Sequence, residues 1–325
     1  MRQLTVKKEI FPLKKAFNIA HGSRNDSYLV YVAITENGIT GEGEGYPYPR
    51  YHETTSSTIR QIEAARRAIE EGCTRAELQK IMPAGSARNA VDLALWDLEA
   101  KQKNLPLWQL AGLPAPKKLS IPYTLVIDEP QQMQQEAVEQ TKVGFKIFKI
   151  KLAGDGFDDE RLNTIRKAVP DAQLVIDANE AWRMEDMLAY TKLCKALKIE
   201  IIEQPFPAKN DHFLEKTEKF TNFCADESCH TSQDLEKLKG KYNMVNIKLD
   251  KTGGLTEALK LYKAAKEQNF KVMVGCMVSS SLSIRPAYYL AQLADFADLD
   301  GPYLLKQDRA NGLIFQNGAV SETAL

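Results

Sequence analysis

The sequence predicts an α/β fold: a modified TIM barrel of the (β/α)7β type with an N-terminal α+β capping domain. Three observations lead to this prediction. From residue 120 onward, short β-branched runs alternate with polar segments of helical periodicity. Eight such runs occur, which favours a closed barrel, with a doubly wound open sheet as the structural alternative. The chain before residue 116 does not follow this alternation.

The N-terminal segment, residues 1–115, is expected to form the capping domain over one mouth of the barrel. Its segments LTVKKEIFPL, YLVYVAIT and NGITGEGE have the pattern of antiparallel strands, and Asn37-Gly38 is a strong signal for a hairpin turn. Two stretches of helical spacing follow, TIRQIEAARRAIEEG and ARNAVDLALWDLEAKQKN. This mixture indicates a separate α+β unit.

Residues 116–301 are expected to form the barrel. Its predicted strands are SIPYTLVI from Ser120, FKIFKIKL from Phe145, AQLVIDAN from Ala172, IEIIEQP from Ile199, NFCADES from Asn222, NMVNIKL from Asn243, FKVMVGCM from Phe270 and DFADLDG from Asp295. Helical segments such as DDERLNTIRKAV and TEALKLYKAAKEQ lie between them. The last residues, 302–325, contain no clear helix and are expected to return to the capping domain. The barrel should therefore have seven βα units and a final strand.

Composition restricts the class of protein. Lysine plus arginine equal aspartate plus glutamate at 43 each, so no overall field attracts nucleic acid or an anionic membrane. The five cysteines are odd in number and scattered, which indicates a reducing compartment. The start MRQLTVKKEI lacks the apolar core of a signal peptide. We expect a cytoplasmic protein without a nucleic-acid or membrane partner, and leave a homo-oligomer open.

Two lysines in the second predicted barrel strand raise a question. Lys149 and Lys151 alternate with apolar residues, so their ammonium groups leave the same face, about 6.6 Å apart along the strand. Taken alone, the pattern is that of a half-exposed strand with a solvated outer face. The residues at the other strand ends favour a chemical role instead.

In this architecture the reactive groups lie at the C-terminal ends of the strands. Three consecutive strands end in the acids Asp177, Glu203 and Asp226, whose mutual repulsion is costly without a cation between them. A set of oxygen ligands without histidine or thiolate suits Mg²⁺. Each acid also has an individual explanation, as a solvated group or a cap for the next helix. Their occurrence on three successive strands favours the metal site.

The lysines then predict acid–base chemistry. The second and sixth strands of such a barrel lie opposite each other, so Lys151 and Lys248 would reach a bound carbon from two sides. A lysine base needs its pKa lowered from about 10.4 to about 7 to 8. We expect Lys149 to contribute roughly 2.5 kcal/mol to that shift in Lys151 at an effective dielectric of about 20. Removal of a proton beside a carboxylate gives an enediolate, which a divalent cation stabilises.

Six motifs together resemble one known family. They are KIK at 149–151, DANEAW from Asp177, EQP from Glu203, ADES from Ala225, NIKLDKTGG from Asn246 and VGCM from Val274. In order and spacing this set resembles the enolase superfamily, in its muconate-lactonizing subgroup, over essentially the whole chain. General knowledge of enolase-superfamily sites pairs lysine or histidine bases with Mg²⁺. The resemblance implies one Mg²⁺ per subunit on Asp177, Glu203 and Asp226, and an acid/base pair formed by Lys151 and Lys248.

The resemblance also implies groups that bind a small dipeptide. Lys149 would lie beside the substrate carboxylate, and Asn179 beside the metal ligands. DLDGP, which contains Asp298 and Asp300, is similar to the motif with which dipeptide epimerases hold a free ammonium; solvated loop acids are the alternative. Arg24, in the segment HGSRND that is expected to form a loop of the capping domain, resembles an arginine that meets the side-chain carboxylate of glutamate. The implied reaction interconverts L-Ala-D-Glu and L-Ala-L-Glu, in recycling of murein peptides.

One position departs from the family pattern, because Ser279 stands where many relatives carry glutamate. This leaves the fine specificity in doubt. The alternatives are a dipeptide epimerase of other specificity, a sibling enzyme of the o-succinylbenzoate synthase or cycloisomerase type, a Schiff-base aldolase using Lys248, or a non-catalytic peptide-binding protein. The four histidines show no ligand spacing and receive no role from the sequence.

Overall fold

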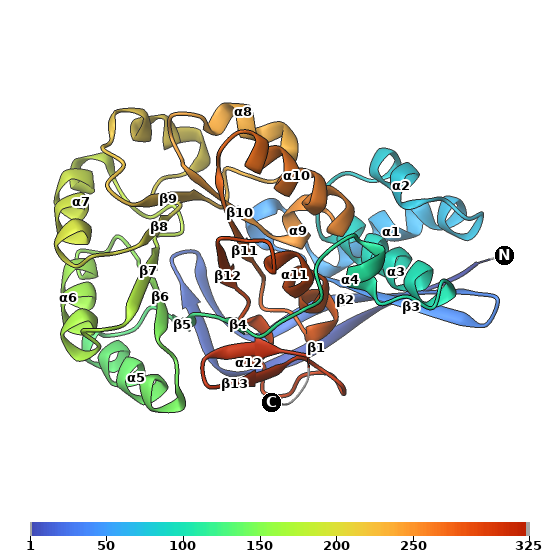
Figure 1. The fold of residues 1–325 in the computed structure, drawn as a ribbon, viewed down its shortest axis with the longest axis horizontal. Helices are drawn as coiled ribbons and strands as arrows, with labels where there is room; N and C mark the ends of the chain where they lie inside the picture. Colours follow the sequence, from blue (N-terminus) through green and yellow to red (C-terminus); the bar gives the residue numbers. More distant parts are fainter. Residues whose placement is uncertain (1, 323–325) are drawn as a thin grey trace.

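The computed structural model describes residues 2–322 and contains three sheets (Figure 1). A three-stranded antiparallel sheet near the N-terminus lies beside a curled sheet of eight parallel strands. The third sheet joins the end of the chain to the segment that precedes the barrel. This architecture confirms the predicted fold class of a modified barrel with an α+β capping domain.

The N-terminal sheet consists of two successive hairpins. Its strands are β1 (Gln3–Ile19), β2 (Gly22–Glu36) and β3 (Ile39–Gly45). The second hairpin closes with two residues, Asn37 and Gly38, which both have positive φ, at 52° and 78°. This confirms the turn predicted from the Asn-Gly pair. The first hairpin is longer than expected from sequence, because the HGSRND segment forms its turn and the start of β2.

Helices cover one face of this sheet. The elements are η1 (Pro49–Tyr51), α1 (Thr55–Glu70), α2 (Arg75–Ile81), α3 (Ser86–Gln102) and α4 (Leu107–Leu110). Helix α3 packs directly on β3, where a Cβ added to Gly43 would lie 2.1 Å from the backbone oxygen of Ala90. The repeated glycines of ITGEGEG therefore permit the helix to contact the strand backbone.

The barrel sheet follows the order of the sequence. Its strands are β5 (Tyr123–Leu125), β6 (Ile147–Lys151), β7 (Gln173–Asp177), β8 (Ile201–Glu203), β9 (Asn222–Ala225), β10 (Met244–Ile247), β11 (Lys271–Gly275) and β12 (Phe296–Asp298). Every neighbouring pair is parallel. The outer strands are linked through a side chain, because the backbone N–H of Thr124 donates to Asp300 Oδ2 at 2.9 Å.

Helices surround the outer face of this sheet (Figure 1). The elements are α5 (Pro130–Val143), α6 (Asp158–Ala168), η2 (Met184–Asp186), α7 (Met187–Ala196), η3 (Ala208–Lys216), η4 (Ser232–Asp234), α8 (Leu235–Leu238), α9 (Leu249–Thr252), α10 (Leu255–Glu267) and α11 (Ser281–Ala291). Long helices alternate with the strands except after β8 and β9, where a 3-10 helix and a very short helix stand instead. Buried apolar side chains of strands and helices form one continuous core.

The final segment returns toward the N-terminal sheet. It contains α12 (Gly301–Leu304), β13 (Ile314–Gln316) and β14 (Ala319–Ser321), and β14 pairs with β4 (Leu119–Ser120). Leu305 bridges Leu13, and the backbone N–H of Lys306 donates to the carbonyl of Pro12 at 2.8 Å. Residues 323–325 lie outside the described part of the chain. The predicted domain limits at residues 115 and 301 stay a proposal.

Two other sequence expectations can be compared with the structure. All five cysteines are free; four are buried, and Cys276 is partly buried. Within residues 2–322, each helix is too short or too polar to span a bilayer. The cytoplasmic location expected from the sequence stays a prediction.

Candidate active site

The predicted site residues lie together at one edge of the barrel sheet. Because the strands are parallel, their C-terminal ends meet at this edge. A cavity of about 60 Å³ there is lined by Lys151, Asn179, Asp226 and Lys248 from the barrel, and by Arg24 from the capping hairpin. Ligand pockets usually measure about 300 Å³ or more, so this cavity is small for a dipeptide.

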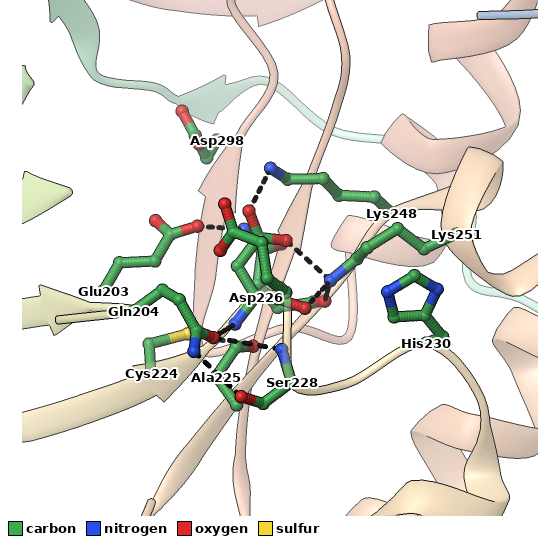
Figure 2. Close-up of polar contacts among 12 residues, drawn as sticks. Glu203, Gln204, Cys224, Ala225, Asp226, Ser228, His230, Lys248, Lys251 and Asp298 are labelled. Carbon is green, nitrogen blue, oxygen red and sulfur yellow. Dashed lines mark hydrogen bonds and ion pairs between the residues drawn. The ribbon is translucent and has the colours of Figure 1, made fainter. Parts of the chain in front are cut away.

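The two lysines predicted as acid and base each contact an acid predicted as a metal ligand. Lys151 Nζ lies 2.6 Å from Asp177 Oδ2. Lys248 Nζ lies 2.7 Å from Asp226 Oδ2, a contact that Figure 2 shows. Burial lowers the pKa of Lys248, but the carboxylates of Asp226 and Glu203 outweigh burial and raise it above its ordinary value. These carboxylates therefore favour the charged form of Lys248.

Lys149 is surrounded by carboxylates as well. Its Nζ lies 2.7 Å from Glu203 Oε2, 2.7 Å from Asp298 Oδ2 and 3.2 Å from Asp177 Oδ2. Burial lowers the pKa of Lys149, yet Asp298, Glu203 and Asp177 together raise it well above the usual value. Lys149 is thus not simply a repelling neighbour of Lys151, as its strand position had suggested. Its charge is balanced by acids on three other strands, which the strand pattern does not reveal.

Asp226 is held by more residues than the sequence predicted. Lys251 Nζ lies 2.6 Å from Asp226 Oδ1 and also donates to the backbone oxygen of Asp226 at 2.6 Å (Figure 2). Burial raises the pKa of Asp226, but Lys248 and Lys251 outweigh it and lower the pKa well below the usual range. Lys251 belongs to the same NIKLDKTGG motif as Lys248, so the motif contained a signal for it.

Gln204 positions the loop that carries Asp226. Its Oε1 accepts the backbone N–H groups of Asp226 at 2.9 Å and Ser228 at 3.1 Å. Its Nε2 donates to the backbone oxygen of Phe206 at 2.8 Å and to the hydroxyl of Tyr242 at 3.0 Å. Figure 2 shows this amide between β8 and the loop after β9. Gln204 has a positive φ of 36°, so its backbone conformation is unusual for a residue other than glycine.

Glu203 and Glu227 are two buried acids whose pKa values are both raised. Asn246 Nδ2 donates to Glu203 Oε1 at 2.8 Å, and Asn246 is two residues before Lys248, on the same strand face. Burial and the repulsion from Asp177 raise the pKa of Glu203. Burial also raises the pKa of Glu227, and repulsion from the carboxylate of Asp226 raises it further. Glu227 is a site residue that the sequence prediction does not include.

The donor set fits a hard divalent cation. The carboxylates of Asp177, Glu203 and Asp226 are buried and converge without a histidine or cysteine among them. An ammonium group already lies between two of them, because Lys149 Nζ contacts both Asp177 and Glu203. Burial raises the pKa of Asp177, but Lys151 and Lys149 outweigh it and bring it to about 2. Ionised oxygens thus face a space that attracts positive charge.

The two acids predicted to hold an ammonium are buried close to one another. Asp298 is 4% exposed and Asp300 is 5% exposed. Asp298 Oδ1 accepts no hydrogen bond from the described residues, while Oδ2 contacts Lys149. Burial, followed by the repulsion from Asp298, raises the pKa of Asp300 to about 6. One oxygen of Asp298 therefore remains available for a cationic ligand.

Arg24 extends from the capping hairpin into the same cavity. Its guanidinium lies 5.5 Å from the ring centroid of Tyr46 and 5.6 Å from that of Tyr48. Burial lowers the pKa of Arg24. Its interacting partner is the hydroxyl of Tyr48, and among residues 2–322 no carboxylate forms an ion pair with it. Arg24 is thus a partly desolvated cation with the capacity to bind an acid.

The loop after β7 links the barrel to the capping domain. The backbone N–H of Asn179 donates to Asp177 Oδ1 at 2.9 Å, and Asn179 Nδ2 contacts Glu227 Oε1 at 3.4 Å. Asn179 and Glu180 both have positive φ, at 42° and 68°. Arg50 of the capping domain donates to both oxygens of Glu180, at 2.6 and 2.7 Å. This contact between the domains is not predictable from the strand and helix pattern.

The position that departs from the family pattern is also buried. Ser279 Oγ has no hydrogen-bond partner within the described chain. The next residue, Ser280, donates its hydroxyl to Glu44 Oε2 at 2.6 Å. Glu44, on β3, thus contributes a carboxylate near the end of β11, although it does not replace a side chain at position 279.

Comparison with known families matches both parts of the chain. Residues 132–321 match the enolase C-terminal domain-like family. Residues 1–112 match the N-terminal domain of mandelate racemase and muconate lactonizing enzyme. The two matches agree with the resemblance found in the sequence motifs.

Individual relatives cover almost the whole chain. It is 47% identical over 318 residues to the L-Ala-D/L-Glu epimerase of Escherichia coli (strain K12), covering 98% of this chain and 99% of the relative. It is 39% identical to the N-acetyl-D-glutamate racemase of a Pseudoalteromonas species, and this match covers 90% of this chain and 92% of the relative. Both named activities invert a stereocentre.

Solved structures of dipeptide epimerases and their homologues resemble this chain as well. An enolase family member from Agrobacterium tumefaciens, with homology to dipeptide epimerases, contains bound sodium and L-Ala-L-Glu. Its structure superposes on this chain with a TM-score of 0.95 and 42% sequence identity, and the match covers 98% of this chain and 97% of the Agrobacterium chain. The dipeptide epimerase of Enterococcus faecalis, complexed with Mg and L-Leu-L-Tyr, superposes on this chain with a TM-score of 0.91 and 33% sequence identity. The match covers 98% of this chain and 96% of the Enterococcus chain.

Proposed function

This chain belongs to the mandelate racemase and muconate lactonizing enzyme family of the enolase superfamily, and we propose that it interconverts L-Ala-D-Glu and L-Ala-L-Glu. Its relatives are named epimerases and racemases, and the chain is accordingly an isomerase. The finer assignment to an acidic dipeptide is supported by the guanidinium of Arg24, which lines the cavity without an acidic partner among the described residues.

The observation that carries the proposal is the pair Lys151 and Lys248. Both line the same cavity, and they come from the ends of β6 and β10, four positions apart in an eight-stranded sheet. Strands so spaced lie on opposite sides of a barrel. One amine removes the α-proton of the C-terminal residue, and the other returns a proton from the opposite side. This exchange inverts the stereocentre through an enediolate.

Asp177, Glu203 and Asp226 are the residues that would hold Mg²⁺, one per subunit. When bound there, Mg²⁺ supplies positive charge to the substrate carboxylate and stabilises the negative charge that develops on deprotonation. Neutralisation of these carboxylates also removes the interaction that raises the pKa of Lys248. The lysine can then lose its proton more readily and act as a base.

The remaining groups orient the dipeptide. Lys149 would donate to the substrate carboxylate, and Asn179 would support the metal ligands. Asp298 and Asp300 would hold the free ammonium of the N-terminal residue. Arg24 would bind the side-chain carboxylate of the glutamate, for which a guanidinium offers a bidentate fit.

A racemase of N-acylated glutamate is the second candidate. One relative is named N-acetyl-D-glutamate racemase, whose substrate has no ammonium. In this chain Asp298 already contacts Lys149, and Asp300 accepts the backbone N–H of Thr124. These contacts would satisfy both acids in part without a substrate ammonium. A comparison of dipeptide with N-acetyl-glutamate substrates separates the two candidates.

The test is an exchange experiment in D₂O with Mg²⁺. The substrates are L-Ala-D-Glu, L-Ala-D-Gln and N-acetyl-D-glutamate, and the measurements are deuterium at the α-carbon by mass and configuration by chiral chromatography. We expect L-Ala-D-Glu to be inverted fastest, with one deuterium incorporated. EDTA should abolish turnover, whereas borohydride should trap no Schiff base. Faster inversion of N-acetyl-D-glutamate would favour the second candidate.

Lysine variants test the two-base mechanism. Lys151→Ala and Lys248→Ala should each slow interconversion by about 100-fold or more, because each removes a group that transfers a proton. The exposed Lys142→Ala is the matched control and should retain full activity. Normal interconversion by either site variant would exclude the mechanism. We further propose that the reaction serves recycling of murein peptides in the cytoplasm.

A further inference from the structure

A second group of metal-ligating side chains lies at the junction between the capping hairpin and the barrel. His21, Glu180 and Glu227 each offer one ligand atom, and these atoms lie within 4.8 Å of one another. His21 forms the turn of the β1–β2 hairpin, while the two acids follow β7 and β9. The three residues are far apart in the sequence, and only the docking of the hairpin brings them together.

Glu180 is held in place before any ion binds. Arg50 donates to both of its oxygens, and the backbone N–H of Ala208 donates to Oε1 at 3.0 Å. His21 Nε2 lies 3.4 Å from Oε2 of the same carboxylate. Carboxylates that bind metals are commonly oriented by such outer hydrogen bonds, which fix the oxygen that faces the ion.

Glu227 provides an independent indication of a ligand. The residue is 6% exposed, and its Oε2 has no hydrogen-bond partner within residues 2–322. Its other oxygen has a long contact of 3.4 Å with Asn179 Nδ2. A buried carboxylate oxygen without a partner is costly, and a cation next to it would satisfy that oxygen.

We propose that His21, Glu180 and Glu227 form a binding site for a transition-metal cation such as Zn²⁺, separate from the three acids assigned to Mg²⁺. An imidazole nitrogen with two carboxylates suits Zn²⁺ better than Mg²⁺, because Mg²⁺ prefers oxygen ligands. Three protein ligands also leave one position of a tetrahedral site open for water.

The site has a consequence for access to the cavity. Arg24 is three residues after His21 and lines the cavity together with Glu227. A cation bound between His21 and the two acids fastens the hairpin turn to the barrel. Because the closed cavity of about 60 Å³ is too small for a dipeptide, fastening the hairpin slows exchange of substrate and product. Zn²⁺ is therefore an inhibitor at this site.

The binding test does not depend on the proposed reaction. Zn²⁺ is titrated calorimetrically into protein saturated with Mg²⁺, for the wild type, His21→Asn, Glu227→Gln and the control His52→Asn. His52 is exposed and has a φ of 60°, which asparagine tolerates. Loss of a ligand should weaken Zn²⁺ binding by about 10- to 100-fold or more in the first two variants, and His52→Asn should bind like the wild type.

The same titrations with Mg²⁺ alone should give equal affinities for the wild type and His21→Asn. If His21→Asn binds Zn²⁺ as tightly as the wild type, the site does not exist, and Zn²⁺ has entered the Mg²⁺ site. Thermal unfolding confirms that each variant is folded.

The inhibition test rests on the proposed epimerase activity. In saturating Mg²⁺, Zn²⁺ should slow turnover of L-Ala-D-Glu by the wild type, with about tenfold less effect on His21→Asn. Equal inhibition of both proteins would overturn the role of this site in access. Failure of the proposed reaction would appear instead as no turnover without Zn²⁺, while the calorimetric result would be unaffected.

Discussion

Substitution of Arg24 tests how the cavity selects its substrate. The guanidinium lies against Tyr46 and Tyr48, is partly buried and has no acidic partner within the described residues. We expect Arg24→Gln to weaken the reaction of L-Ala-D-Glu, whose side chain carries a carboxylate. The reaction of the neutral, isosteric L-Ala-D-Gln should change little, because it offers no charge to the guanidinium.

The magnitude follows from the type of contact. A hydrogen bond to a charged group contributes about 1.5 to 3 kcal/mol, which corresponds to about 10- to 150-fold in kcat/KM. Burial of Arg24 places the effect toward the upper part of this range, since solvent screens the interaction less. For L-Ala-D-Gln, the loss should stay within about 3-fold, as for a change without a charged partner.

The assay measures kcat/KM for both dipeptides by chiral chromatography, with the wild type, Arg24→Gln and the control Arg67→Gln. Arg67 is 89% exposed in its side chain and lies on α1, away from the cavity. The ratio of the two kcat/KM values is the decisive quantity, because a general loss of folded protein cancels from it. An unchanged ratio in Arg24→Gln would refute the recognition role of this arginine.

Three further predictions concern the supporting residues. Gln204→Leu leaves the buried backbone N–H of Asp226 without its acceptor, so the free energy of unfolding should fall by about 1 to 3 kcal/mol. Calorimetry should also show weaker binding of Mg²⁺. An unchanged Mg²⁺ affinity would contradict a positioning role for Gln204. Asp300 has a pKa of about 6 and must be ionised to hold an ammonium group, so kcat/KM for L-Ala-D-Glu should fall as the pH decreases through 6. The same decline in Asp300→Asn would assign this pH dependence to another group. Burial raises the pKa of Glu180, but His21 and Arg50 outweigh burial and lower the pKa from 4.5 to about 2. The ionised Glu180 therefore stabilises the fold above pH 4.5, and this contribution is lost as the pH falls toward 2. Allowing for solvent around Arg50, Glu180→Gln should cost about 1 to 2 kcal/mol near pH 7 and little near pH 2 in chemical unfolding; a pH-independent cost would contradict the ion pair.

The periodic parts of the fold were predictable from sequence. All eight predicted barrel runs contain a strand, and the Asn37-Gly38 turn has the expected conformation. Alternation and helical spacing are properties of neighbouring residues, so they can be recognised without knowledge of the partners. The shape of the β1–β2 hairpin was not predicted, because its turn contains no strong turn pair and is positioned by contacts with the barrel.

The site was predictable where it depends on strand ends. Parallel strands bring their C-terminal residues to one edge, so Asp177, Glu203 and Asp226 could be grouped before any distance was known. Gln204 was overlooked because its role depends on backbone groups more than 20 residues later in the chain. Its place directly after Glu203, in the EQP motif, gave only a weak local signal.

The sequence by itself determined the order of the strands and the chemical groups at their ends, because both depend on short-range patterns and on the parallel arrangement that they imply. Only the tertiary structure decided which charges are balanced. Lys149 meets acids from three other strands, and Arg50 meets Glu180 across 130 positions of sequence. The distances between such groups result from packing of whole elements, and the electrostatic energy depends on those distances and on burial.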